Sequence, residues 1–182
     1  MVRTAANVYG PSDDSRLLLD ALRVAPGERI LEVGTGTGYV ALHAAKAGIV
    51  VATDVNPEGV RLARKNAAAN GLRVAVVRCD LLRGLRGVFD VIAFNPPYLI
   101  EAVGGDWEAR AWQGGTMGET VILRFLAEAP ARLARDGRIY LLIPSNREGA
   151  IAAAREHFEV RIAAKKPLFF EELLVLELMH PR

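Results

Sequence analysis

The segment LEVGTGTGYV (residues 31–40) places a glycine-rich loop between a predicted strand and a predicted helix. The apolar residues up to Val33 indicate a buried strand, and a periodicity typical of a helix follows at about 38–47. In doubly wound sheets such a turn binds nucleotide-like cofactors, because glycines let the ligand approach the backbone and the helix N-terminus donates free N–H groups. The segment therefore predicts a cofactor site at the carboxyl end of the first strand.

Two details of this loop restrict the class of cofactor. A dinucleotide fingerprint requires a third glycine three residues after the second, but Tyr39 stands three residues after Gly36. Glu32 places a carboxylate just before the first glycine, Gly34. At about 4 Å and an effective dielectric of about 20, a unit charge contributes roughly 4 kcal/mol, which opposes a pyrophosphate and favours an ammonium or a sulfonium. The loop is therefore predicted to bind a cationic ligand.

Strand-like and helix-like segments alternate along the chain, which is typical of an α/β fold with a parallel sheet covered on both faces. The expected strands are 28–34, 49–54, 73–79, 89–94 and 137–143, and the expected helices are 38–47, 57–70, 118–135 and 146–157. Two further strand-like stretches, 159–167 and 171–179, leave no room for a crossover helix, so they are expected to be antiparallel neighbours. The predicted architecture is an open, mostly parallel sheet that ends in an antiparallel edge hairpin.

A further helix is predicted ahead of the sheet. Ser12 is expected to cap it, with the carboxylates of Asp13 and Asp14 in its first turn near the positive end of the helix dipole. The simplest interpretation of this pattern is a structural helix cap. At 182 residues and 51% hydrophobic, the chain is expected to form one domain over 1–182, with 1–27 as an N-terminal cap-helix region.

Composition indicates neither a strongly charged partner nor an oxidising compartment. The 23 basic and 21 acidic residues give a net charge of +2, which supplies no strong field for nucleic acid or a membrane surface. The single cysteine, Cys79, excludes an internal disulfide and is expected to be buried and inert. No apolar stretch reaches membrane-spanning length and no signal peptide is evident, so a cytoplasmic location is expected. We expect no metal.

Two acidic residues stand at the ends of predicted strands. Asp54 ends the second strand and can accept both hydroxyls of a ribose, a role common to NAD and S-adenosylmethionine. Asp80 ends the third strand and can accept a hydrogen bond from an adenine amino group. The alternative for each acid is an ordinary turn residue at a strand end.

The stretch FNPPY (residues 94–98) ends the fourth predicted strand, which lies beside the first in a sheet of this order. Asn95 is therefore expected to face the cofactor crevice. Pro96 and Pro97 supply no N–H donor, and Pro97 turns Pro96 away from helical geometry, which leaves the Pro96 carbonyl free to point outward. With the Asn95 side-chain carbonyl, this makes two acceptors for a planar NH₂ group, and Tyr98 is expected to cover the flat face of that group.

These acceptors suit methyl transfer from a sulfonium to a poorly nucleophilic nitrogen. Resonance withdraws the lone pair of an amide or aromatic amine, and acceptors aimed at both hydrogens favour the positive charge that develops on nitrogen. Such a reaction requires geometry and electrostatics from the protein rather than a nucleophilic side chain. Core or surface roles are therefore expected for His43, His157 and His180.

Four motifs in order, LEVGTGTG, ATDVN, RCD and FNPPY, resemble those of class I S-adenosylmethionine-dependent methyltransferases of the Asn-Pro-Pro-Tyr type. The segments VYGPSDDSRLLLDAL, AWQGGTMGETVILRFL and LFFEELLVLEL further resemble the small HemK-like glutamine methyltransferases of archaea and eukaryotes. The resemblance implies a Rossmann-like fold with a seven-stranded sheet, and S-adenosylmethionine as cofactor. It also implies N5-methylation of the glutamine in the Gly-Gly-Gln motif of the class-1 translation termination factor, often with a small zinc-binding activator protein as heterodimeric partner.

The resemblance also implies roles for individual residues. The implied cofactor contacts are Glu32, Gly34 and Gly36 at the methionine end, Asp54 and Val55 at the ribose, Asp80 and Leu81 at the adenine, and Tyr9, Ser15 and Asn95 around the pocket. The implied acceptor site consists of Asn95, Pro96, Pro97 and Tyr98, with Trp112, Gln113, Gly114 and Gly115 at the substrate entrance. Glu119 and Thr120 stand where the family pattern has an arginine and an acid, so no contact is carried over to these two positions.

Other functions stay open at this point. A nucleobase methyltransferase acting on adenine or guanine in RNA or DNA would use the same motif, although the small net charge and the lack of a basic face with interleaved aromatics speak against it. A cofactor-binding module without catalysis would be expected to have damaged nitrogen-holding residues, and these are intact.

Recognition of a protein substrate needs a further surface. The resemblance implies that bacterial members of the family carry an extra N-terminal domain that docks the release factor; none is expected here, because few residues precede the cofactor loop. Recognition is then expected from the 97–116 loop, a sheet edge or a partner. The apolar run 171–179 is expected to form an exposed edge strand to which a partner strand could add.

Overall fold

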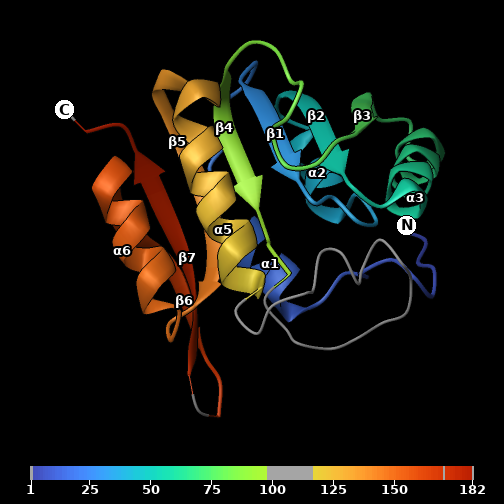
Figure 1. Cartoon of the computed structure of the whole chain (residues 1–182). Helices are drawn as coiled ribbons and strands as arrows, with labels where there is room; N and C mark the ends of the chain where they lie inside the picture. The colour runs from blue at the N-terminus through green and yellow to red at the C-terminus, as the bar shows by residue number, and fades with distance from the viewer. Residues whose placement is uncertain (1, 98–116, 170, 182) are drawn as a thin grey trace.

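A seven-stranded sheet organises the computed structural model, which describes residues 2–97, 117–169 and 171–181. The strands are β1 (Arg29–Val33), β2 (Ile49–Asp54), β3 (Val74–Arg78), β4 (Phe89–Phe94), β5 (Leu133–Pro144), β6 (Glu159–Pro167) and β7 (Glu172–Met179). Their order across the sheet is β3-β2-β1-β4-β5-β7-β6 (Figure 1). β1 to β5 pair in parallel, whereas β7 is antiparallel to both β5 and β6. The predicted α/β architecture and the antiparallel hairpin are confirmed.

Helices cover both faces of this sheet (Figure 1). They are α1 (Asp13–Ala21), α2 (Tyr39–Ala44), α3 (Pro57–Ala69), α5 (Met117–Glu128), the 3₁₀ helix η1 (Ala129–Arg132) and α6 (Glu148–His157). Side chains alternate along each strand, so one face of the central strands packs against α1, α2 and α3 and the other face packs against α5 and α6. In β4, Val91 belongs to the first of these two cores, and Ile92 to the second.

Several element boundaries differ from the sequence predictions. The helix predicted over 118–135 ends at Glu128, because Pro130 cannot continue the backbone hydrogen bonds of an α-helix and lies in the 3₁₀ turn that follows. β5 then begins at Leu133 rather than at 137. Its pairing with β4 is irregular between Phe89 and Val91, and Gly137 accommodates this because a Cβ there would lie 2.9 Å from the Leu133 side chain.

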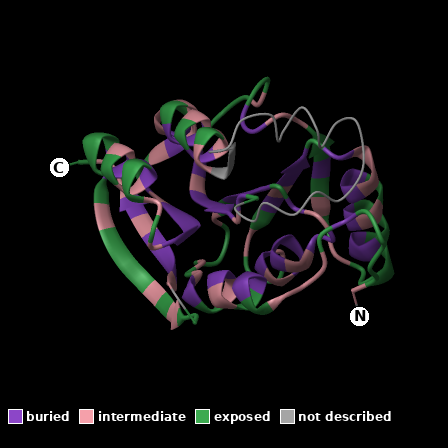
Figure 2. Cartoon of the chain, turned by 60° about the horizontal axis from the view of Figure 1, so that its bottom comes forward, coloured by how far each residue is buried: buried purple, intermediate pink, exposed green. Residues whose placement is uncertain are grey.

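The prediction of an exposed edge strand at 171–179 is wrong. β7 lies between β5 and β6, so both of its edges are hydrogen-bonded and residues such as Val175 and Leu178 are fully buried. The free edges of the sheet belong to β3 and β6, and much of β6 is exposed (Figure 2). A strand at the end of the chain need not be the outermost strand, because a long antiparallel hairpin can insert its second strand next to the parallel sheet.

The prediction of a buried Cys79 is also wrong. Cys79 follows the edge strand β3 and is partly exposed. Its thiol donates a hydrogen bond to the Arg83 carbonyl oxygen at 2.8 Å, and partial burial raises the pKa of the thiol, which keeps it protonated. Among the helices that the structure describes, none combines the length and apolarity needed to cross a bilayer.

Candidate functional site

The ends of three parallel strands bring the predicted site residues to one edge of the sheet. Val33, the last residue of β1, pairs with Thr53 of β2 on one side and with Phe94 of β4 on the other. The Thr35 N–H donates to the Thr53 carbonyl at 2.8 Å, which ties the glycine loop to β2. Ligands of open α/β sheets bind at such a point, where the strand order changes direction next to β1. The prediction that β4 ends beside β1 is confirmed.

The glycine loop adopts a backbone that other residues rarely take. Gly34, Gly36 and Gly38 have φ values of 67°, 52° and 85°, in the left-handed region that favours glycine. A Cβ on Gly36 would lie 3.0 Å from the carbonyl oxygen of Tyr9, and one on Gly38 would lie 3.2 Å from the Cβ of Ala63. The loop is therefore held closely between the N-terminal segment and α3.

Glu32 lies beneath this loop, with only 6% of its surface exposed. Its Oε2 accepts hydrogen bonds from the Thr35 hydroxyl and, at 2.9 Å, from the Ala41 N–H in α2. Burial raises the pKa of Glu32 to about 8, against the lowering effect of these two donors, and the nearby Asp54 carboxylate raises it further. Through these two hydrogen bonds the carboxyl group of Glu32 holds the glycine loop in place. A cation bound beside this group would favour its ionised form. Its contact with the cofactor stays a prediction.

Asp54 joins the glycine loop to the end of β2. Its Oδ2 accepts from the Gly36 N–H at 2.7 Å and its Oδ1 from the Asn56 N–H at 2.8 Å, while burial raises its pKa. Each carboxylate oxygen has two lone pairs, so acceptor capacity for ribose hydroxyls is left. Val55, the next residue, is exposed beside it. A Cβ on Gly59 would lie 2.9 Å from Asp54 Oδ2, so glycine there gives the carboxylate its room.

The predicted adenine contacts, Asp80 and Leu81, follow β3. Asp80 Oδ2 accepts from the Arg124 guanidinium of α5 at 2.7 Å, a contact that the sequence did not predict. Leu81 is buried and has a φ of 51°, the one positive φ of a non-glycine residue in the described part of the chain. A positive φ in a residue other than glycine is a strained backbone conformation that costs free energy, and such conformations are found mainly at functional sites. The backbone of Leu81 therefore supports a binding role for the Asp80–Leu81 turn.

The N-terminal segment contributes a residue that the sequence analysis missed. Ser12 occupies the N-cap position of α1 but makes no capping hydrogen bond, so the predicted cap is wrong. Its hydroxyl donates instead to Asp14, which is buried and also receives the Tyr9 hydroxyl at 2.6 Å and the Ser15 N–H at 2.6 Å. The missed signal was helical spacing, because Asp14 stands four residues before the buried Leu18 and shares its face.

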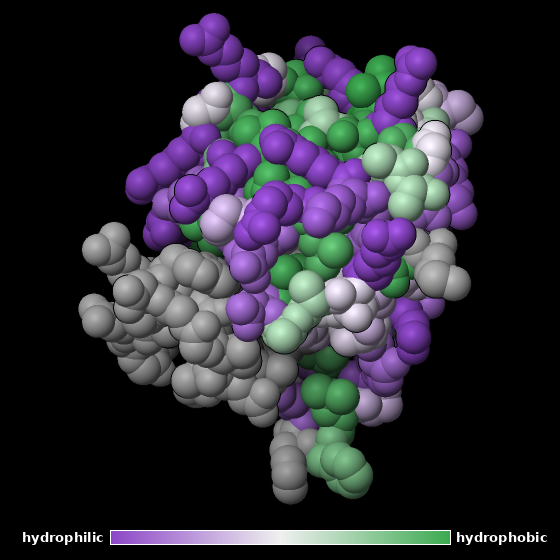
Figure 3. Space-filling model, turned by 90° about the vertical axis from the view of Figure 1, so that its right-hand side faces the viewer, coloured by the Kyte–Doolittle hydropathy of each residue, from purple (hydrophilic) through white to green (hydrophobic). Residues whose placement is uncertain are grey.

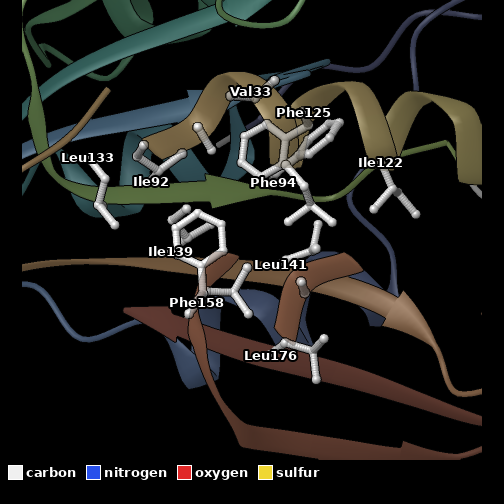
Figure 4. Close-up of a cluster of buried hydrophobic side chains, with 14 of the residues drawn as sticks. Val33, Ile92, Phe94, Ile122, Phe125, Leu133, Ile139, Leu141, Phe158 and Leu176 are labelled. Atoms are coloured by element: carbon white, nitrogen blue, oxygen red, sulfur yellow. The ribbon is translucent and has the colours of Figure 1, made fainter. Parts of the chain in front are cut away.

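Asn95 follows a residue that is anchored in the core. The Phe94 ring lies against Phe125 of α5, with ring centroids 4.8 Å apart (Figure 4). The Asn95 Nδ2 donates to Asp14 Oδ2 at 3.3 Å, whereas its Oδ1 is buried and has no hydrogen-bond partner within the described residues. Pro96 is buried and Pro97 exposed. Tyr98 and the predicted entrance residues 112–115 lie outside the described residues.

The remaining predictions concern histidines and the departures from the family pattern. His43 Nδ1 lies 2.7 Å from the Tyr39 carbonyl oxygen, and His180 Nε2 lies 3.4 Å from that of Leu133. Both contacts fit structural roles. Glu119 has a structural role as well, since its Oε1 accepts from the Ala150 N–H at 3.0 Å and thereby joins α5 to the first turn of α6.

These residues fit S-adenosylmethionine in three respects. The left-handed Gly34, Gly36 and Gly38 give the loop the tight turn that is typical of a cofactor loop between a strand and a helix. Glu32 and Asp54 supply two buried carboxyl groups next to the loop, whose raised pKa values would fall if a cation or a hydrogen-bond donor bound beside them. Asn95 Oδ1 has no hydrogen-bond partner in the part of the chain that the structure describes, so it can accept from a further molecule.

Comparison with known proteins identifies the family of this chain. The family model "Methyltransferase small domain" matches residues 2–169. A Methanocaldococcus jannaschii protein, provisionally named as a protein N5-glutamine methyltransferase, is 35% identical over 177 residues, covering 93% of this chain and 90% of its own. Mouse methyltransferase HEMK2 is 38% identical over 152 residues, covering 75% of this chain and 71% of its own.

A solved structure with the same fold is the E. cuniculi Mtq2–Trm112 complex, which is responsible for methylation of the translation termination factor eRF1. Its matching chain is 26% identical, with a TM-score of 0.75, and the match covers 96% of this chain and 99% of the other. The sheet order and the antiparallel β7 are those of the Rossmann-like methyltransferase fold. The chain therefore belongs to the methyltransferase small-domain family of class I S-adenosylmethionine-dependent methyltransferases.

Proposed function

We propose that this methyltransferase acts on protein glutamine, methylating N5 of the glutamine in the Gly-Gly-Gln motif of the class-1 translation termination factor. The observation that carries methyl transfer to an NH₂ nitrogen is the buried Oδ1 of Asn95, which has no hydrogen-bond partner among the described residues; the relatives favour glutamine as its source. A buried acceptor without a donor is unfavourable by about 1–3 kcal/mol, so the site is suited to a substrate N–H. Translation termination would place the enzyme in the cytoplasm.

The chemistry of an amide nitrogen explains why such an acceptor is needed. When bound, S-adenosylmethionine supplies a methyl group on a sulfonium, which is a strong electrophile. Asn95 Oδ1 and the Pro96 carbonyl would accept the two hydrogens of the glutamine NH₂ and fix the direction of its nitrogen. Positive charge would develop on that nitrogen as the N–C bond forms and the S–C bond of the sulfonium breaks, and the preorganised acceptors would stabilise it until one proton passes to water.

The named relatives support glutamine as the acceptor. The M. jannaschii protein matches over nearly its whole length, and the E. cuniculi complex, which acts on a termination factor, matches over 99% of its chain. The presence of Trm112 in the same complex supports a heterodimer for this chain, and the family resemblance implies that the partner is a small zinc-binding activator protein. An added strand could pair with the free edge of β3 or β6, and Figure 3 shows the β3 side as largely hydrophilic with hydrophobic side chains between.

Transfer of a tritiated methyl group tests the substrate. The purified chain, alone and with its co-expressed partner, is incubated with the termination factor of its own cell, the Gln→Ala variant of that factor, and total RNA. Label is expected in the factor and not in its variant. Label in RNA alone would refute the proposal and favour the second candidate, a nucleobase methyltransferase, since an Asn-Pro-Pro-Tyr motif can hold an adenine or guanine amino group equally well.

Gel filtration of the co-expressed protein tests the partner. A heterodimer whose methyl transfer exceeds that of the lone chain is expected. A stable monomer with full activity would contradict the partner proposal and leave the substrate assignment untouched.

A further inference from the structure

The Asp14 carboxylate joins the N-terminal segment to the predicted acceptor site. It is only 5% exposed, although it comes from the first turn of α1, where acids usually face solvent. Its Oδ2 accepts from the Tyr9 hydroxyl at 2.6 Å and from the Asn95 Nδ2 at 3.3 Å. Asp14 and Asn95 lie far apart in the sequence, so this contact exists only in the folded chain.

A carboxylate at this place determines which way the Asn95 amide faces. The amide carries a donor on Nδ2 and an acceptor on Oδ1, and an ionised carboxylate only accepts hydrogen bonds. The Nδ2 must therefore face Asp14, and the Oδ1 must face away from it. That direction leaves Oδ1 buried and without a partner in the described part of the chain, which is the state that an incoming N–H donor requires.

Further donors hold Asp14 itself in place. The Ser15 N–H donates to its Oδ1 at 2.6 Å, and the Ser12 hydroxyl donates to the same oxygen. Because the Ser15 N–H belongs to the backbone of α1, it cannot reverse its polarity. Burial and the Asp14 contact raise the pKa of Tyr9 to about 12, so its hydroxyl stays protonated and able to donate.

We propose that Asp14 is a positioning residue that fixes the side-chain amide of Asn95 with Oδ1 toward the acceptor NH₂ group. The inference rests on the proposed function, because a planar NH₂ group of a substrate is what the buried Asn95 Oδ1 would bind. Tyr9 belongs to the same hydrogen-bonded group through its hydroxyl, and its backbone carbonyl lies next to Gly36 of the cofactor loop. One carboxylate thus couples the cofactor loop, the first turn of α1 and the acceptor site.

Asp14→Asn tests the direction of the amide with almost no change in shape. The fixed Ser15 N–H requires an acceptor, so the new side-chain oxygen takes the Oδ1 place and the new NH₂ takes the Oδ2 place. Asn95 must then rotate to present its oxygen to that NH₂, which turns its own donor toward the substrate. The kcat is expected to fall by about 100-fold, with the Kd for S-adenosylmethionine changed by less than about threefold.

The matched control is Asp13→Asn, the neighbouring acid of the same helix turn. Its side chain is 67% exposed and pairs with Arg16 and Lys166 on the surface. This variant is expected to keep the kcat, the Kd and the melting temperature of the wild type. Equal losses in both variants would mean that helix charge, rather than the orientation of Asn95, explains the effect.

A double variant separates positioning from a merely structural role. Asn95→Asp alone places two carboxylates against each other and is expected to be nearly inactive. Asp14→Asn combined with Asn95→Asp restores a donor–acceptor pair and leaves one carboxylate oxygen facing the substrate. The kcat of the double variant is expected to be at least about tenfold higher than that of Asp14→Asn, because the effects of substitutions at two coupled residues are not additive. No recovery would overturn the inference.

A spectroscopic readout decides the point without any methyl acceptor. In protein labelled with ¹⁵N-asparagine, the side-chain amide signal of Asn95 is assigned by its loss in Asn95→Ala. Its protons are expected to exchange more slowly than those of the exposed Asn146 in the wild type and in Asp13→Asn, but not in Asp14→Asn. Fast exchange in the wild type would overturn the inference. If the wild type leaves the termination factor unmethylated, the proposed function fails, while this readout still decides the role of Asp14.

Discussion

The raised pKa of Glu32 predicts that binding of S-adenosylmethionine releases a proton. Burial raises this pKa to about 8, so at pH 7 roughly nine-tenths of the free protein holds a neutral Glu32. A sulfonium at about 4 Å would favour the carboxylate by roughly 4 kcal/mol at an effective dielectric of about 20. At 1.36 kcal/mol per pKa unit, that lowers the pKa by about three units, to about 5.

The expected magnitude follows from these two pKa values. Binding at pH 7 should release about 0.9 proton, and the affinity should rise close to tenfold per pH unit between about pH 5 and 8, then level off. The folding stability of the free protein depends on pH with the opposite sign to the cofactor affinity. The folded state binds a proton that the unfolded chain has lost above its ordinary value of 4.5, so folding stability decreases as the pH rises through this window towards 8.

Calorimetry in two buffers of different ionisation enthalpy measures the released protons directly. Burial also raises the pKa of Asp54, so the decisive comparison is with Glu32→Gln, which should lose the proton release assigned to Glu32. Asp54→Asn is the complementary control. Equal proton release in the wild type and in Glu32→Gln, or a pH-independent affinity in the wild type, would refute the reasoning.

Three further predictions concern other residues. Asn95→Ala should keep the affinity for S-adenosylmethionine within about tenfold but abolish methyl transfer, and about a tenth of wild-type activity would contradict its role. Asp54→Ala should weaken cofactor binding by about 1.5–3 kcal/mol in calorimetry, because charge-assisted hydrogen bonds are lost; an unchanged Kd would remove Asp54 from the site. Arg138 donates to both carboxylate oxygens of Glu28, at 2.9 and 2.8 Å, and lowers the pKa of that carboxyl. Arg138→Met should therefore lower the free energy of unfolding at pH 7 by about 1.5–3 kcal/mol in urea melts. Because this stabilisation is present above the ordinary pKa of 4.5 and is lost as the pH falls through the lowered one, the difference between wild type and variant should shrink in acid; an equal difference at low pH would contradict the ion pair as its source.

Much of the fold could be predicted because its signals are local. Strand and helix periodicities depend on neighbours within one turn or one pleat, and the alternation of the two implies a parallel sheet. The predictions failed where a local pattern competed with a specific residue or with distant pairing. Pro130 ended α5 earlier than its apolar pattern suggested, and the position of β7 depended on β5, which lies far from it in sequence.

Some residues of the candidate site could be predicted from local sequence, whereas others depended on contacts between distant segments. Glycines 34 and 36, Asp54 and Asn95 could be chosen in advance because each directly follows or ends a predicted strand, and parallel strands end at one edge. Asp14 was interpreted only as an acid near the helix dipole; its spacing from Leu18 indicates a buried helix face but does not identify its partners. Its burial against Asn95 and Tyr9 arises only when α1 packs beside the end of β4.

The sequence by itself determined the sheet class, and it predicted the cofactor loop and the chemical character of the acceptor site, since these follow from residue types at fixed spacings. Only the tertiary structure decided which strands form the edges, how deeply Glu32 is buried and which group holds Asn95. The physical reason is that burial and hydrogen-bond partners are properties of groups brought together from distant parts of the chain. A carboxylate has the same chemistry in Asp13 and Asp14, and the fold alone turns one toward solvent and the other toward the acceptor site.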